Sequence, residues 1–142
     1  LLEKQGADYD PRVRVALELG HFISARDYLL AQRLRGELIR LAHRALGSYR
    51  ALIVPTMAVP TPLVGQERWR WPDGEEPVSE AVSRFLSPAN LLGFPAAAIP
   101  WRMTTAGIPA SVQVIARPLD EGIVLRVGAV LELAANARPP GR

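Results

Sequence analysis

Apolar residues recur at helical spacing between residues 24 and 46, which predicts one long amphipathic helix. Ser24 followed by Asp27 is a capping-box variant at its start, and Gly47 is a typical residue after its end. We expect one stripe of this helix to be buried. The stripe consists of Tyr28, Ala31, Leu34, Leu38, Leu41 and Ala45.

Shorter helices are predicted nearer the two ends of the chain. Asp10 and Pro11 begin one of them, because Asp caps free N–H groups and Pro is tolerated in the first turn. Asp120 is expected to cap the last helix. The apolar face of that helix comprises Val124, Val127, Leu131 and Ala134. Residues 136–142 are polar and proline-rich, so we expect a flexible tail.

Three apolar runs predict β-strands, at residues 51–54, 96–99 and 110–116. The first follows a helix directly, which is typical of a buried, parallel strand. Pro100 is expected to stop the second. Together with the helices, these strands predict an α/β fold.

The third predicted strand contains one polar residue among apolar ones. Val112, Val114 and Ala116 alternate and therefore share a face, with Gln113 between them. If Gln113 is buried, its amide needs hydrogen-bond partners.

Residues 55–79 are rich in proline, and we predict a long loop here, followed by a short helix over residues 80–85. Loops of this length are usually functional or disordered. Trp69 and Trp71 could anchor the loop or form a lid over a pocket. The acidic residues Asp73, Glu75 and Glu76 could bind a cation, although such a run more often lies in solvent.

Composition restricts the classes of protein that fit. The chain has 142 residues, 49% of them hydrophobic and 22% charged, as in a folded domain. The absence of cysteine excludes thiol nucleophiles, disulfides and thiolate metal sites, and favours the cytoplasm. The net charge is +3, and acidic residues are interspersed among the basic ones, which argues against a nucleic-acid-binding surface. No apolar run approaches the roughly 18 residues that a membrane span needs. Without a starting methionine, the sequence is expected to be a fragment or a processed piece.

No complete catalytic or metal site is present in the sequence. The serines lack the glycine-rich elbow of a nucleophile, and His21 and His43 lack a metal-ligand spacing. We therefore expect no catalytic residue, no metal and no cofactor in this chain.

An arginine stripe on the long helix leaves two interpretations open. It consists of Arg26, Arg33, Arg40 and Arg44. Guanidinium groups could hold a carboxylate or phosphate, and with Trp69 and Trp71 they would make a stand-alone, non-catalytic binding domain. The stripe could equally be a solvent face on which Glu37 pairs with a neighbouring arginine.

Four segments carry motifs in a fixed order along the chain. Residues 23–28 begin the long helix, and residues 52–56 contain a strand followed by a Pro-Thr turn. Residues 85–96 contain the pattern Asn-x-x-Gly-x-Pro, and residues 107–115 contain Gly-x-Pro-x-x-x-Gln. Together, from about residue 9 to residue 133, these segments resemble the C-terminal third of the amidase-signature hydrolases.

This resemblance implies part of an enzyme that hydrolyses amide carbon–nitrogen bonds. It implies the C-terminal portion of a single amidase domain over residues 1–142, with a mixed β-sheet and helices on both faces. The family's Ser–cis-Ser–Lys triad and Gly/Ser-rich signature lie upstream, and Lys4 is not in a matching context. The implied partners are a small amide substrate, the rest of the domain and a second copy in a homodimer, without membrane or nucleic acid.

The resemblance also implies that this region shapes the acyl side of the substrate pocket. The expected substrate-binding residues are Pro55, Thr56, Phe85 and Asn90. Independently, ligands of open α/β sheets bind beyond the carboxyl ends of parallel strands, where Pro55 and Thr56 are expected. Some amidotransferase subunits of the family carry an Asp shortly before the Asn-x-x-Gly-x-Pro segment. Here residues 83–85 are Ser-Arg-Phe, and the amidotransferase role stays open.

Overall fold

A computed structural model describes residues 2–136 of the chain. Its contacts divide the chain into two compact units, Leu1–Arg40 and Leu41–Arg142. None of the helices in residues 2–136 is long and apolar enough to cross a membrane.

The first unit is entirely helical, and local capping defines its helices. Arg12 N–H donates to Asp10 Oδ1 at 2.9 Å, and Asp27 N–H donates to Ser24 Oγ at 3.1 Å, which confirms both predicted helix starts. Ser24 Oγ in turn donates to Asp27 Oδ2 at 2.6 Å. The elements are α1 (Leu2–Gln5), the 3-10 turn η1 (Gly6–Asp8), α2 (Pro11–Leu19), the 3-10 turn η2 (Gly20–Phe22) and the larger part of α3 (Ala25–Leu46).

The predicted burial of the α3 stripe is wrong. Tyr28 is 57% exposed and Leu38 is 42% exposed, and neither α2 nor α3 contains a buried residue. The helical periodicity is present, but no other described element of the first unit covers this face. On the polar side, Arg40 pairs with Glu37, as the solvent-face interpretation of the arginines expects.

A three-stranded antiparallel sheet forms the centre of the second unit. Its strands are β1 (Ala51–Pro55), β4 (Ala96–Met103) and β5 (Pro109–Ala116), in the order β1-β5-β4. Strand β1 pairs with β5 and runs antiparallel to it, with Pro55 opposite Val112. The expectation that the first strand is parallel is therefore wrong for this pair of strands. A short apolar run indicates burial but does not determine the direction of its neighbour.

Pro100 does not stop the second strand. Strand β4 continues to Met103, and its pairing with β5 shifts register between Pro100 and Arg102. Because β4 lies at an edge of the three-stranded sheet, a proline at this irregularity removes no hydrogen bond to an outer neighbour.

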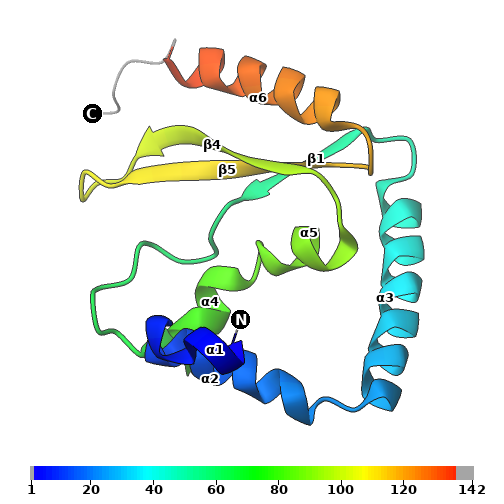
Figure 1. Cartoon of the computed structure of the whole chain (residues 1–142). Coiled ribbons are helices and arrows are strands. Elements are labelled where there is room, and N and C mark those ends of the chain that lie inside the picture. The colour runs from blue at the N-terminus through cyan, green and yellow to red at the C-terminus, as the bar shows by residue number, and fades with distance from the viewer. Residues whose placement is uncertain (1, 137–142) are drawn as a thin grey trace. The chain divides into compact units, whose positions relative to one another are not determined.

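Helices cover both faces of the sheet, as expected for this fold (Figure 1). Helix α6 (Glu121–Asn136) packs on one face, where Val114, Ala116 and Val124 are buried together. Gly128 allows a close approach, because a Cβ there would lie 2.9 Å from Ile99 Cδ1. Asn136 is the last residue of this helix, so the first residue of the predicted tail is helical, and residues 137–142 of that prediction lie outside the described residues.

The segment predicted as a continuous loop contains a β-hairpin. Strands β2 (Arg68–Trp71) and β3 (Gly74–Pro77) pair antiparallel, with Trp69 opposite Glu76. Cross-strand contacts stabilise the hairpin, including an ion pair of 3.1 Å between Arg68 Nε and Glu75 Oε1. Of the prolines that suggested a loop, Pro60 and Pro62 precede this hairpin, Pro72 lies in its turn and Pro77 ends β3.

Two short helices follow the hairpin, α4 (Val78–Ser83) and α5 (Ser87–Leu92). The first agrees with the predicted short helix, whereas α5 was not predicted. Gly93 ends α5 in the left-handed conformation with φ of 71°, and its N–H donates to the Ala89 carbonyl at 2.9 Å. Glycine is favoured there because it adopts positive φ without steric cost.

Candidate functional site

One face of β5 carries the polar groups of the candidate site. Ser111 and Gln113 alternate along the strand and share this face, while Val114 points to the opposite face under α6. Ser111 Oγ donates to Thr56 Oγ1 at 2.8 Å, and Gln113 Nε2 donates to the Phe85 carbonyl at 2.8 Å. Thr56 and Phe85 are therefore attached to positions of one strand about 7 Å apart.

Gln113 is the buried polar residue that holds this arrangement together. It is only 4% exposed, and its bond to the Phe85 carbonyl joins β5 to the segment between α4 and α5. A buried amide without a partner would be costly, so this bond fixes the position of Phe85 relative to the sheet. The predicted need of Gln113 for a partner is met.

The four residues expected to bind substrate do not all lie in one pocket. Thr56 and Phe85 are brought to the same face of β5, as described above. Pro55 is exposed at the end of β1. Asn90 is exposed within α5 rather than in a turn, and its main-chain carbonyl accepts from the Gly93 N–H at 3.3 Å.

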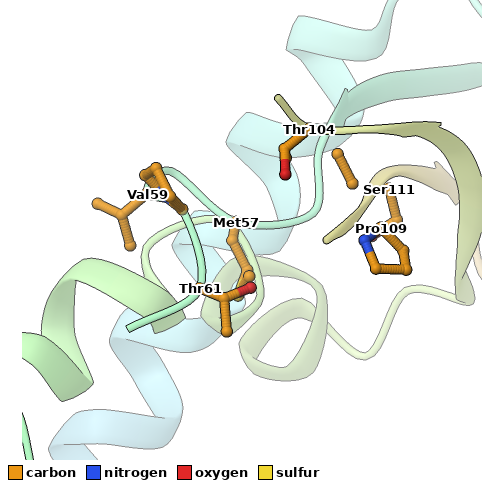
Figure 2. A pocket seen from close by; sticks show the side chains of 8 residues that line it. Met57, Val59, Thr61, Thr104, Pro109 and Ser111 are labelled. Atoms are coloured by element: carbon orange, nitrogen blue, oxygen red, sulfur yellow. The ribbon is translucent and has the colours of Figure 1, made fainter. Parts of the chain in front are cut away.

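A small hollow of about 80 Å³ lies beside the Thr56–Ser111 pair. Figure 2 shows Met57, Val59 and Thr61, from the segment after β1, together with Thr104, Pro109 and Ser111 around the β4–β5 turn. The hydroxyl groups and prolines of this hollow could contact a small polar group of a ligand. We refer to it as the small hollow.

A larger hollow of about 480 Å³ lies on the Phe85 side of the segment after β1. It is lined by Ala58, Trp71, Asp73, Arg84 and Phe85, and we call it the tryptophan hollow. Ala58 lines this hollow, whereas its neighbours Met57 and Val59 line the small one. The extended segment therefore separates the two hollows.

The wall of the tryptophan hollow is held by Glu76. Trp71 Nε1 donates to Glu76 Oε1 at 2.6 Å, and Arg84 Nη2 donates to both carboxylate oxygens at 2.8 and 2.7 Å. The guanidinium of Arg84 also lies 5.7 Å from the centroid of the Trp71 ring. The hydrogen bonds from Arg84 and then from Trp71 lower the pKa of Glu76 below its usual value, so this carboxylate is ionised at neutral pH.

Sequence reasoning suggested Trp71 as part of a lid but missed the role of Arg84 and Glu76. These two residues are eight positions apart and belong to different elements. The one available signal was the excess of acidic residues before α4, which the sequence alone left as a solvated run. In the structure, Glu75 pairs with Arg68 and Glu76 pairs with Arg84.

The hydrogen bonds of the described serines explain three of them as structural groups. Ser111 donates to the Thr56 hydroxyl and Ser83 donates to the Ser79 carbonyl at 2.7 Å, and neither acceptor is a general base. Ser24 donates to the Asp27 carboxylate and accepts from the Asp27 N–H, which is the capping arrangement at the exposed start of α3.

Histidines and carboxylates likewise form no catalytic or metal group within the described residues. The ring of His43 packs against Phe94 with centroids 5.2 Å apart. Across residues 2–136, no three His, Asp or Glu side chains gather where they could hold a metal ion.

Comparison with known proteins identifies the class to which this scaffold belongs. The sequence profile of the amidase family matches residues 2–125. The chain belongs to the amidase family, and the resemblance in its four sequence segments is confirmed.

Similar proteins include an amidase of Pseudomonas putida, 37% identical over 129 residues, and a fatty acid amide hydrolase of Medicago truncatula, 31% identical over 119 residues. These alignments cover 90% and 84% of this chain but only 28% and 20% of the relatives. A crystal structure of an amidase matches with a TM-score of 0.84 at 30% identity, over 94% of this chain and 31% of that chain. The chain thus spans less than a third of the relatives that it matches, and the stand-alone binding domain is not favoured.

Proposed function

We propose that this chain provides the scaffold and part of the substrate pocket of an amidase that hydrolyses amide carbon–nitrogen bonds. The residues that perform the chemistry would lie in other parts of the enzyme. The observation that carries this proposal is the attachment of Thr56 and Phe85 to one face of β5, beside two hollows.

The contacts of each residue suggest a particular role in such a pocket. Thr56 accepts a hydrogen bond from Ser111, so its own hydroxyl proton is available to a substrate oxygen or nitrogen. Phe85 lines the tryptophan hollow and offers an apolar surface to an acyl group. Pro55 and Asn90 would contribute as neighbours of these two residues, on β1 and α5.

The names of the relatives support amides as substrates. The Pseudomonas relative is an amidase, and the Medicago relative is a fatty acid amide hydrolase. A single amidase domain that includes residues 1–142, a cytoplasmic location and a homodimeric complete enzyme belong to the same proposal. These three points rest on the sequence considerations given above.

Replacement of Thr56 by Val in the complete protein tests the proposal. The change keeps the shape of the side chain and removes the hydroxyl, so we expect the KM for simple amides to rise about twofold to tenfold, equivalent to about 0.5–1.5 kcal/mol. Thr56→Ser keeps the hydroxyl and should behave like the wild type. Steady-state kinetics on aliphatic and aromatic amides gives these values, and thermal unfolding checks that stability is retained.

The residues 1–142 alone serve as the second arm of this experiment and are expected to hydrolyse none of the amides. Turnover by this segment that survives repurification and disappears when one of its serines is mutated would contradict the proposed division of roles. A complete protein without amide hydrolysis, or a Thr56→Val variant with unchanged kinetics on every substrate, would contradict the proposed function or the role of Thr56, respectively.

A further inference from the structure

The tryptophan hollow has the size and lining of a site for a ring-shaped group. Its volume of about 480 Å³ lies within the range of small-molecule pockets, which is roughly 300–1,000 Å³. Trp71 and Phe85 provide aromatic surface, and Ala58 adds a small apolar side chain to the lining. Aromatic side chains bind planar rings through stacked or edge-to-face contacts.

The position of the Trp71 ring is fixed before any ligand binds. Its indole N–H is bonded to Glu76, and the guanidinium of Arg84 lies against the ring. Glu76 in turn holds Arg84 through both carboxylate oxygens. A wall held in this way loses little conformational freedom when a ligand binds, which favours affinity.

The charged side chains around the hollow carry a small net negative charge. The positive charge of Arg84 is compensated by Glu76 in direct contact, and Asp73 adds a further negative charge to the lining. Among the described residues, no other Arg, Lys or His lines the hollow. A carboxylate entering this space would meet Asp73 without a free positive charge to compensate it.

We infer that the tryptophan hollow binds the aromatic acyl group of a neutral amide and disfavours an acyl group that carries a carboxylate. This inference rests on the proposed function and specifies its substrate class. Trp71 and Phe85 provide the contact surface for the ring. Glu76 is a positioning residue that holds Trp71 and neutralises Arg84, so that Asp73 is left to repel a carboxylate.

Three substrates separate these contributions in the complete protein. Phenylacetamide carries the neutral ring, its para-carboxylate derivative carries the same ring with a negative charge, and acetamide lacks the ring. We expect kcat/KM of the wild type to be highest for phenylacetamide. Trp71→Ala should lower that value about threefold to tenfold, and its loss on acetamide should be clearly smaller, because acetamide has no ring to contact the indole.

A charge variant tests the role assigned to Glu76. Glu76→Gln keeps an oxygen that can accept from Trp71 but removes the negative charge that balances Arg84. Both bonds to Glu76 come from Arg84 Nη2, so the Nε and Nη1 groups remain as donors for a substrate carboxylate. We expect the para-carboxylate substrate to gain up to about fivefold in kcat/KM relative to phenylacetamide.

Control variants on the same hairpin keep the inference falsifiable. Arg70→Ala changes the exposed residue beside Trp71 on the opposite side of β2 and should leave all three preferences unchanged. Trp71→Phe keeps a ring and should keep most of the phenylacetamide preference, even if Trp71→Ala disturbs the hairpin.

The possible outcomes distinguish this inference from the proposed function. No hydrolysis of any of the three amides by the wild type would overturn the proposed function and the inference together. Two other results would overturn the inference alone. One is a kcat/KM of the wild type for the para-carboxylate substrate that equals or exceeds the value for phenylacetamide. The other is an equal loss of kcat/KM on all three amides in both Trp71→Ala and Trp71→Phe.

Discussion

The two units of this chain bury their apolar residues to very different extents. In residues 2–40 the helices are capped and amphipathic, yet neither α2 nor α3 contains a buried residue. In residues 41–136, α6 covers one face of the sheet and Val114 is fully buried. Helix formation is thus specified locally in the first unit, whereas the second unit also supplies its own tertiary contacts.

The difference indicates which part of the chain depends on a partner for stability. Isolated helices are marginal in water, and most of their stability in proteins comes from packing of the apolar face. Soluble monomers rarely expose large contiguous apolar surfaces. We therefore expect the first unit to be ordered by other parts of a complete amidase, in agreement with the small share of its relatives that this chain spans.

The second unit has an edge strand at β1 within the described residues. Strand β1 is an edge of the observed sheet, and beside it lies an apolar hollow of about 450 Å³. Leu52, Leu92, Phe94 and Ile115 are among the residues that line it. Unpaired edges and uncovered apolar surface promote association, so we expect residues 1–142 alone to be less stable than the same residues in a complete protein.

Matched valine substitutions give the largest expected effect. Val114→Asp places a charge in a position that is 0% exposed, so we expect residues 41–136 to lose more than about 3 kcal/mol of unfolding free energy. Val13→Asp changes a residue of α2 that is 49% exposed, and it should cost less than about 1 kcal/mol of unfolding free energy when residues 1–142 are studied alone. Chemical denaturation followed by circular dichroism measures both values.

Repeating the valine substitutions in the complete protein sharpens the comparison. If other parts of the enzyme cover the first unit, Val13→Asp should become about as costly there as Val114→Asp. If the two variants lost the same unfolding free energy when residues 1–142 are studied alone, the contrast between the two units would be contradicted.

Gln113 provides the next largest effect, because it joins the sheet to the candidate site. Gln113→Ala leaves the Phe85 carbonyl without its partner, so we expect a loss of about 1–3 kcal/mol. Gln113→Met approximately keeps the side-chain volume but removes the hydrogen bond, so it separates the contribution of the bond to stability from that of packing. If Met restored the full stability, the bond to Phe85 would contribute little and packing would explain the loss.

Much of the fold could be predicted from the sequence, because local signals determine it. Asp10, Ser24 and Gly47 mark helix ends by capping, and the alternation around Gln113 identifies the two faces of β5. The antiparallel pairing of β1 with β5 could not be predicted, since it depends on which distant strand is adjacent. The hairpin of residues 68–77 was missed because its proline-rich surroundings are typical of loops.

The candidate site was predictable only in part, for a similar reason. The family resemblance pointed to Thr56 and Phe85, and the structure ties both to β5, but it places Asn90 in an exposed helix. The contact of Glu76 with Arg84 depends on the hairpin folding against α4. Because sequence reasoning did not predict the hairpin, it could not predict this contact.

The pH dependence of the hairpin contact is the smallest effect that we expect. The groups that face Glu76 are Arg84 from the end of α4 and Trp71 from β2, and both hydrogen bonds favour the ionised carboxylate. Because the folded-state pKa is lowered from 4.5, the contribution of Glu76 to stability is fully present above that value. It is lost as the pH falls through the lower folded-state pKa. Since Arg84 is about half exposed, solvent screening keeps this contribution small.

Glu76→Gln is the matched variant for this titration, because it cannot ionise and still offers an oxygen to Trp71. Between pH 7 and pH 3 the wild type should lose slightly more unfolding free energy than the variant, and the two curves should approach each other at the acid end. Tryptophan fluorescence during urea unfolding at each pH reports on the hairpin through Trp69 and Trp71, whose rings pack edge to face with centroids 6.5 Å apart, together with Trp101 on β4. Parallel pH profiles would mean that the carboxylate adds nothing to folding, and that the tryptophan wall of the second unit is held by packing alone.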